Sequence, residues 1–144
     1  MKLTFLGTSS MIPTKERNTF SVLLSHEADN ILIDCGEGTQ RQLREINFSP
    51  NKINKILITH WHGDHILGLP GLIQTLAASN YQSILEIYGP VNSKKYFDNI
   101  NKMFINQNKI SIKLIEIKKN GLFYKDGYLS IEAIYLNHTS PCLA

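Results

Sequence analysis

The sequence has few cysteines and no long apolar run. Its 144 residues include two cysteines, Cys35 and Cys142, too few for the disulfide framework of a small secreted protein. We therefore expect two reduced thiols in a reducing compartment. The opening residues, MKLTFLGTSS, lack the apolar stretch and cleavage site of a signal peptide. No apolar run approaches the ~20 residues needed to cross a bilayer. These absences predict a soluble, cytoplasmic protein with no membrane partner.

Strong charge and internal repeats are also missing. The formal net charge is +3, and 42% of the residues are hydrophobic, as in ordinary globular proteins. A charge this small permits an anionic partner without requiring one. Lysines outnumber acids after Pro90, which suits either a solvated surface or a side that faces nucleic acid. The chain has no linker and no dinucleotide-binding glycine fingerprint, so we expect a single domain over residues 1–144.

Short β-type runs dominate the chain, with helical segments between them. Apolar or alternating runs predict strands, and apolar residues three or four apart predict helices. The expected strands cover residues 2–6, 19–25, 30–34, 55–59, 85–88, 111–117, 122–124 and 128–136, and the expected helices cover 39–46, 69–78 and 93–105. This order predicts an α/β or α+β fold with a mixed sheet.

Four potential metal ligands fall within six residues, directly after one of the expected strands. They are His60, His62, Asp64 and His65, in the order HWHGDH. Residues two apart in extended backbone point the same way, so His60 and His62 can bind one metal ion together. Gly63 permits a tight turn that directs Asp64 and His65 to a neighbouring position. These ligands suit Zn²⁺, with Mn²⁺ or Fe²⁺ as alternatives. The competing interpretation is a set of exposed loop histidines beside a helix start.

The motif at residues 60–65 resembles the signature of metallo-β-lactamase-fold hydrolases. Further segments resemble one family of that fold, ribonuclease Z, the tRNA 3′-end processing endonucleases. These segments are FLGTS at 5–9, PTKERN at 13–18, IDCGEGTQ at 33–40 and GLPG at 68–71. The resemblance runs in family order from Met1 to Ala144 and covers the N-terminal half of that family. It implies the N-terminal half of a metallo-β-lactamase αββα sandwich.

The resemblance also implies a role for each matching position. His60 and His62 would bind one zinc ion together with His138, although a histidine after a strand is otherwise more often structural. Asp64 and His65 would serve a second zinc ion, and Asp64 would also be catalytic, acting in proton transfer. The implied cofactors are two Zn²⁺ ions in the complete enzyme. The implied reaction is two-metal phosphodiester hydrolysis that removes the 3′ trailer from precursor tRNA.

Residues outside the metal motif offer further candidates. Lys15, Arg17 and Asn18 lie in a Pro-x-Lys-x-Arg-Asn loop that the family places near the tRNA 3′ end, although an ordinary charged turn has the same composition. Asp34 lies at the end of an expected strand. It is expected to hydrogen-bond to the loop that carries the ligands without contacting the metal, or simply to cap a turn. Trp61 is expected to pack against the protein, with stacking on a base as the alternative.

The match stops where the chain stops. The family's enzymes are roughly twice as long, and their second half supplies further metal ligands and a catalytic histidine. We therefore expect a domain truncated after the motif around His138. It is a fragment of a longer product, a subunit completed by a homodimer or by a complementary C-terminal half, or a degenerate domain. The functional alternatives are another hydrolase of this fold, acting on a small phosphodiester or sulfate ester, and an inactive metal-binding or assembly module.

Overall fold

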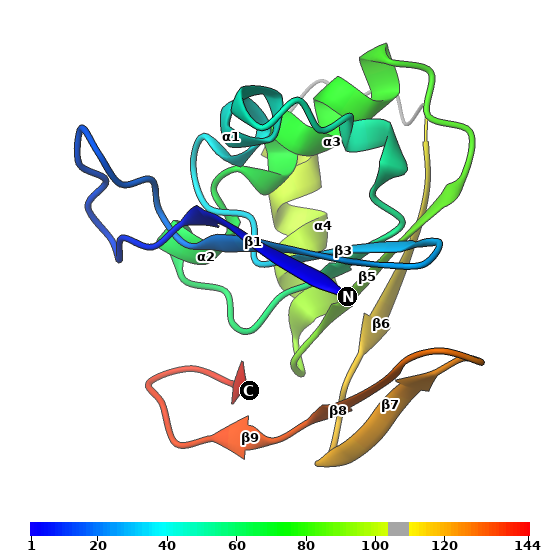
Figure 1. The fold of residues 1–144 in the computed structure, drawn as a ribbon. Coiled ribbons are helices and arrows are strands. Elements are labelled where there is room, and N and C mark those ends of the chain that lie inside the picture. The colour runs from blue at the N-terminus through cyan, green and yellow to red at the C-terminus, as the bar shows by residue number, and fades with distance from the viewer. Residues whose placement is uncertain (104–109) are drawn as a thin grey trace.

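The computed structural model describes residues 1–103 and 110–144 and is built around a six-stranded sheet (Figure 1). The strand order is β1-β2-β3-β4-β5-β6. The first three strands pair antiparallel, whereas β3 to β6 run parallel. This arrangement confirms the mixed sheet expected from the sequence. The strands are β1 (Lys2–Gly7), β2 (Ser21–His26), β3 (Asp29–Ile33), β4 (Lys55–Leu57), β5 (Ile84–Gly89) and β6 (Ser111–Glu116).

Helices cover one face of this sheet (Figure 1). The main core lies between the two layers, where Ile56 and Ile87 of the central strands meet Leu72 and Leu76 of α3, all fully buried. Each such side chain contributes about 1.5–3 kcal/mol when it leaves water. None of the helices in the described part of the chain has the length and apolar character needed to cross a membrane. The helices are α1 (Thr39–Glu45), η1 (Pro50–Lys52), α2 (Gly63–Ile66), α3 (Leu69–Ala78) and α4 (Ser93–Met103).

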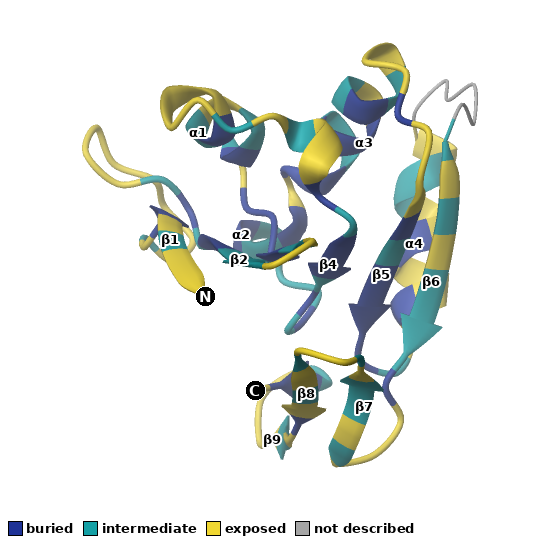
Figure 2. Cartoon of the chain, turned by 45° about the vertical axis from the view of Figure 1, so that its right-hand side comes forward, coloured by how far each residue is buried: buried dark blue, intermediate teal, exposed yellow. Residues whose placement is uncertain are grey.

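The opposite face of the sheet is covered at one end. Two small strand pairs lie there (Figure 1) and form a second apolar cluster with Tyr88 of β5. At the other end, β1 stays uncovered (Figure 2), with Leu3 55% and Phe5 65% exposed. Both residues face away from the helices, because Thr4 between them pairs with Leu23 of the main core. The small strands are β7 (Gly121–Lys125), β8 (Ser130–Ala133), β9 (Tyr135–Leu136) and β10 (Cys142–Leu143).

The ends of several expected elements differ from the observed ones for local reasons. The strand expected over 30–34 ends at Ile33, because Asp34 adopts a left-handed conformation with φ 55°. The strand expected over 55–59 ends at Leu57, and Thr59 donates its backbone N–H to the Asp34 side chain instead.

Other differences concern whole elements. The segment expected as one strand over 128–136 is divided between β8 and β9. The short elements α2 and β10 were not expected, because four and two residues are too few to show a hydrophobic period. Residues 104–105 of the expected third helix lie outside the described residues. The helix expected at 69–78 is α3, with the same bounds.

Candidate metal centre

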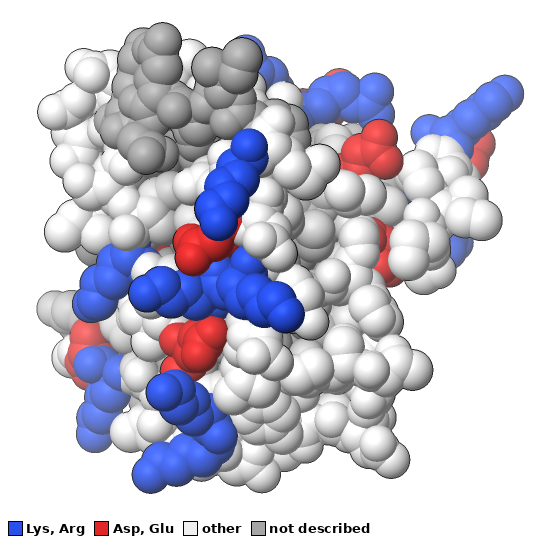
Figure 3. All heavy atoms as spheres, turned by 180° about the vertical axis from the view of Figure 1, so that it is seen from behind, with Lys and Arg blue, Asp and Glu red and all other residues white. Residues whose placement is uncertain are grey.

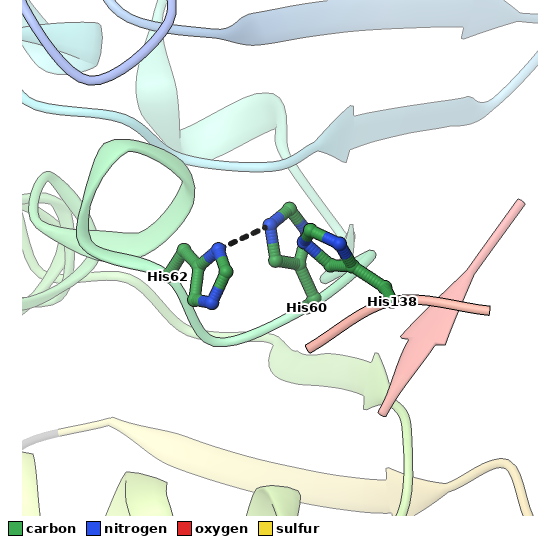
Figure 4. Close-up of side chains that lie close together, drawn as sticks. All are labelled: His60, His62 and His138. Atoms are coloured by element: carbon green, nitrogen blue, oxygen red, sulfur yellow. Dashed lines mark hydrogen bonds between the residues drawn. The ribbon is translucent and has the colours of Figure 1, made fainter. Parts of the chain in front are cut away.

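Histidines from two distant segments meet beyond the end of β4 (Figure 4). His60 follows β4, His62 immediately precedes α2, and His138 lies between β9 and β10. The last segment is held there because Leu143 of β10 donates its backbone N–H to the Thr59 carbonyl at 2.9 Å. This backbone hydrogen bond, between residues 84 positions apart, therefore brings His138 to the other two histidines.

These three residues, which we call the histidine triad, form a compact group. One ring nitrogen from each of His60, His62 and His138 lies within 4.8 Å of the others. The ring centroids are 4.6, 4.9 and 5.0 Å apart. His60 Nε2 and His62 Nδ1 face each other at 3.1 Å. Bonds from zinc to imidazole nitrogen are about 2.0–2.1 Å long, so nitrogens at this separation can share one ion.

The protonation state of His60 suits a cation. Burial, together with the neighbouring His65 and His62, lowers the pKa of His60 to about 4. His60 is therefore neutral at physiological pH and keeps the lone pair that a metal requires. Thr59 Oγ1 lies 3.0 Å from His60 Nδ1 and orients the ring. The three ring nitrogens that converge here fit a metal ion.

Asp34 organises a second pair of donor groups beside the triad. Its carboxylate is fully buried and accepts hydrogen bonds from the backbone N–H and hydroxyl of Thr59, at 2.8 and 2.7 Å, and from His65 Nδ1 at 2.6 Å. Burial alone would lower the pKa of His65, but the hydrogen bond and charge of Asp34 outweigh it and raise that pKa. His65 Nε2 then faces Asp64 Oδ2 at 3.5 Å. The His65 ring lies 4.1 Å from that of His60.

A glycine allows this pair to approach the strand ends. A Cβ atom at Gly36 would lie 2.3 Å from Thr19 Oγ1 and 2.5 Å from the Asp64 carbonyl oxygen. The adjacent Cys35 donates its N–H to the His65 carbonyl at 2.7 Å. The loop after β3 and helix α2 are therefore in direct backbone contact, which no larger residue at position 36 would allow.

The loop expected to bind substrate lies on the surface beside α1. Lys15 and Arg17 are exposed and, together with Arg41 of α1, line a cavity of about 210 Å³. Asn18 has a different role, because its Nδ2 donates to the Glu37 carbonyl at 2.5 Å and holds the turn that leads into α1. The sequence did not single out Arg41, since one basic residue on an exposed helix face carries no signal by itself.

Basic side chains also lie on the back of the molecule, interspersed with acids (Figure 3). Lys94, Lys95 and Lys102 of α4 border a surface hollow there. Asp98 and Glu116 line the same hollow and offset part of the positive charge. This face is compatible with both alternatives left open by the sequence, a solvated surface and a side that faces nucleic acid.

Two residues next to the triad were missed by sequence reasoning. Thr59 contacts both Asp34 and His60, and its one sequence signal is its place before the histidine. Ser93 begins α4 and accepts a hydrogen bond from Trp61 Nε1 at 2.7 Å. The Trp61 ring packs against the main core, as expected.

The chain is similar to one protein family and to several curated ribonuclease Z sequences. The family described as Anti-Pycsar protein Apyc1 matches residues 1–115. Ribonuclease Z of Methanococcus aeolicus is 42% identical over 147 residues, covering 100% of this chain and 45% of that protein. Ribonuclease Z of Nanoarchaeum equitans is 41% identical over 139 residues, covering 96% of this chain and 43% of that protein. The chain therefore spans less than half the length of these curated relatives.

Solved structures agree with the sequence matches. The short form of human tRNase Z superposes with a TM-score of 0.90 at 31% identity, covering 99% of this chain and 63% of that one. The metallo-β-lactamase-fold protein YhfI of Bacillus subtilis has a TM-score of 0.75 at 20% identity, covering 98% of this chain and 56% of that one, which shows the shared fold. The chain belongs to the family described as Anti-Pycsar protein Apyc1, has the metallo-β-lactamase fold, and corresponds along its whole length to the N-terminal half of ribonuclease Z.

Proposed function

We propose that this chain is the zinc-binding half of an endoribonuclease that removes the 3′ trailer from precursor tRNA. The histidine triad carries the proposal, because it brings three imidazole donors together with a carboxylate–histidine pair beside them. The name of the relatives, ribonuclease Z, supports the choice of substrate. Because the chain spans less than half of those relatives, the activity is proposed for an assembly with a second copy or with a complementary C-terminal half.

Each donor group has a proposed part in metal binding. His60, His62 and His138 would hold one Zn²⁺, and Asp64 and His65 would contribute to a second. Such ions, when bound, supply a nucleophile near neutral pH and stabilise charge on the phosphate. Asp64 is proposed as the catalytic residue that holds a proton during the reaction, since its carboxylate lies 3.5 Å from His65 Nε2.

The cavity beside α1, which we call the basic cavity, is proposed to receive the RNA backbone. Lys15, Arg17 and Arg41 bring three cations to its wall. Contacts of such residues with phosphates position a nucleic acid without reading its sequence. Replacing Arg41 with alanine should therefore weaken binding of precursor tRNA, whereas replacing Arg44, on the same helix but outside the cavity lining, should leave it unchanged.

The test is metal stoichiometry and 3′-trailer cleavage, measured on the 144-residue chain alone and with a separately expressed C-terminal half. We expect metal binding that is lost in His62→Ala and retained in His26→Ala, because His26 lies at the end of β2, outside the triad. Cleavage by the chain alone would identify a second copy as the partner, and cleavage only in the mixture would identify the C-terminal half. A wild-type chain that binds no metal would refute the proposal.

The same assay separates the alternative substrate class. Hydrolysis of bis(p-nitrophenyl) phosphate without cleavage of precursor tRNA, in the metal-loaded assembly, would favour a hydrolase of small phosphodiesters. We expect RNA cleavage instead, because the basic cavity is lined by cations from two elements, the loop before β2 and helix α1.

A further inference from the structure

The segment that carries two of the three histidines has little backbone support. β4 ends at Leu57 and α2 begins at Gly63. Within the described residues, neither His60 nor Trp61 makes a hydrogen bond between backbone groups. A metal site nevertheless needs its first two ligands at a fixed separation. Some other contact must therefore hold this irregular stretch in place.

The Trp61 side chain provides such a contact. Its Nε1 donates to Ser93 Oγ at 2.7 Å, and the Ser93 hydroxyl donates in turn to the Pro90 carbonyl at 2.6 Å. Ser93 is fully buried. The indole also packs on Tyr96 of α4, with ring centroids 5.7 Å apart and planes tilted by 31°. Gly89 leaves room for this arrangement, because a Cβ there would lie 2.4 Å from Ser93 Oγ.

We propose that Trp61 is a positioning residue, anchored by Ser93, which sets the separation of His60 and His62 and thereby the affinity of the histidine triad for a divalent metal ion. This inference rests on the proposed metal site and adds residues that contact no metal. Neighbours in extended backbone point to opposite sides, so immobilising the indole on one side orients both imidazoles on the other. Its packing on Tyr96 and its bond to Ser93 leave the indole engaged within the protein, and its role is structural support of the ligands.

We expect a loss of metal affinity when the hydrogen bond between Trp61 and Ser93 is removed. Ser93→Ala removes the hydroxyl that accepts the indole N–H, and Trp61→Phe removes the N–H while keeping an aromatic ring. Outer partners of metal ligands typically change affinity about 10–100-fold when replaced, so we expect each variant to bind Co²⁺ and Zn²⁺ roughly 10-fold more weakly. Competition with a chromophoric chelator measures the affinity, and the visible spectrum of bound Co²⁺ reports its coordination geometry. Trp61 is the one tryptophan of the chain, so its fluorescence follows metal binding in Ser93→Ala.

A matched control separates positioning from general loss of stability. Tyr81 is also buried and donates its hydroxyl to a backbone carbonyl, that of Ile53, at 2.8 Å. Tyr81→Phe therefore removes a comparable hydrogen bond away from the triad and should leave metal affinity within threefold of the wild type. Equal affinity in the wild type, Ser93→Ala and Trp61→Phe would overturn the positioning role but leave the metal site standing. A similar loss in Tyr81→Phe would also overturn it, and failure of the wild type to bind either metal would overturn the metal site as well.

Discussion

His60 and His65 belong to one short motif and lie side by side, yet their pKa values shift in opposite directions. His60 is buried among other imidazoles, which disfavour a second positive charge, whereas His65 donates to the buried carboxylate of Asp34. Environment, rather than residue type, therefore assigns each side chain its state. At this scale the site contains both a neutral imidazole, His60, and a histidine oriented by a carboxylate, His65.

The thiol of Cys35 gives a prediction at the same scale. Burial, with a smaller contribution from the charge of Asp34, raises its pKa to about 12. Because the thiolate is the reactive form, we expect Cys35 to resist iodoacetamide at pH 8 in the folded protein and to react after unfolding in urea. The Cys142→Ser variant leaves Cys35 as the one thiol, so mass spectrometry counts its modification directly. Rapid modification of this folded variant at pH 8 would contradict the prediction.

At the scale of elements, a buried ion pair fastens the β7–β8 hairpin to the sheet. Lys55 of β4 and Asp29 of β3 lie 2.5 Å apart, with side chains 9% and 13% exposed. Lys55 Nζ also lies 4.6 Å from the centre of the Tyr124 ring on β7. The Tyr124 hydroxyl donates to Asp126 at 2.8 Å and approaches Asp29 at 3.3 Å. Charge and aromatic contacts therefore connect the hairpin to two central strands.

Removing one partner of this pair should cost more than removing an exposed counterpart. Lys55→Met leaves the carboxylate of Asp29 largely buried without its cation, and such losses are about 3 kcal/mol. Lys113→Met is the control, because Lys113 pairs with Glu86 at 2.9 Å but its side chain is 61% exposed. We expect this change to cost under about 1 kcal/mol. Urea unfolding followed by circular dichroism gives both free energies, and equal losses would show that burial does not distinguish the two pairs.

At the scale of the whole molecule, the sheet has one face covered by helices and another covered at one end. Leu3 and Phe5 lie on the uncovered part of β1, which is also an edge strand (Figure 2). An exposed apolar edge strand offers both unpaired backbone groups and apolar side chains to another chain. The same face thus suits either proposed partner, a second copy or a complementary half.

We therefore expect the 144-residue chain to associate with itself in solution as its concentration rises. Phe5→Glu should reduce this association, because it places a charge within the apolar contact. Ile46→Glu is the matched control, since Ile46 is 42% exposed but follows α1 on the side covered by helices. Sedimentation velocity over a range of concentrations measures the effect. A monomer at all concentrations, or equal effects of both substitutions, would rule out this face as the contact.

Much of the local structure was predictable because it depends on neighbouring residues. The period of apolar residues predicted α3 at its observed bounds, and alternating apolar residues predicted the sheet strands to within a few positions. The ligand motif at residues 60–65 was readable for the same reason, since its spacing is short. By contrast, Asp34 left its expected strand because a left-handed backbone there lets its carboxylate reach Thr59 and His65.

The fold class, the resemblance to ribonuclease Z and the candidate ligands could be predicted from the sequence, because motifs and hydrophobic periods are properties of adjacent residues. The tertiary structure decided which of these groups meet. It brought His138 to His60 through the bond between β10 and Thr59, and placed Ser93 under the Trp61 indole. Such contacts join residues 32 to 84 positions apart. They follow from strand order and the path of the chain between elements, which no local pattern of residues encodes.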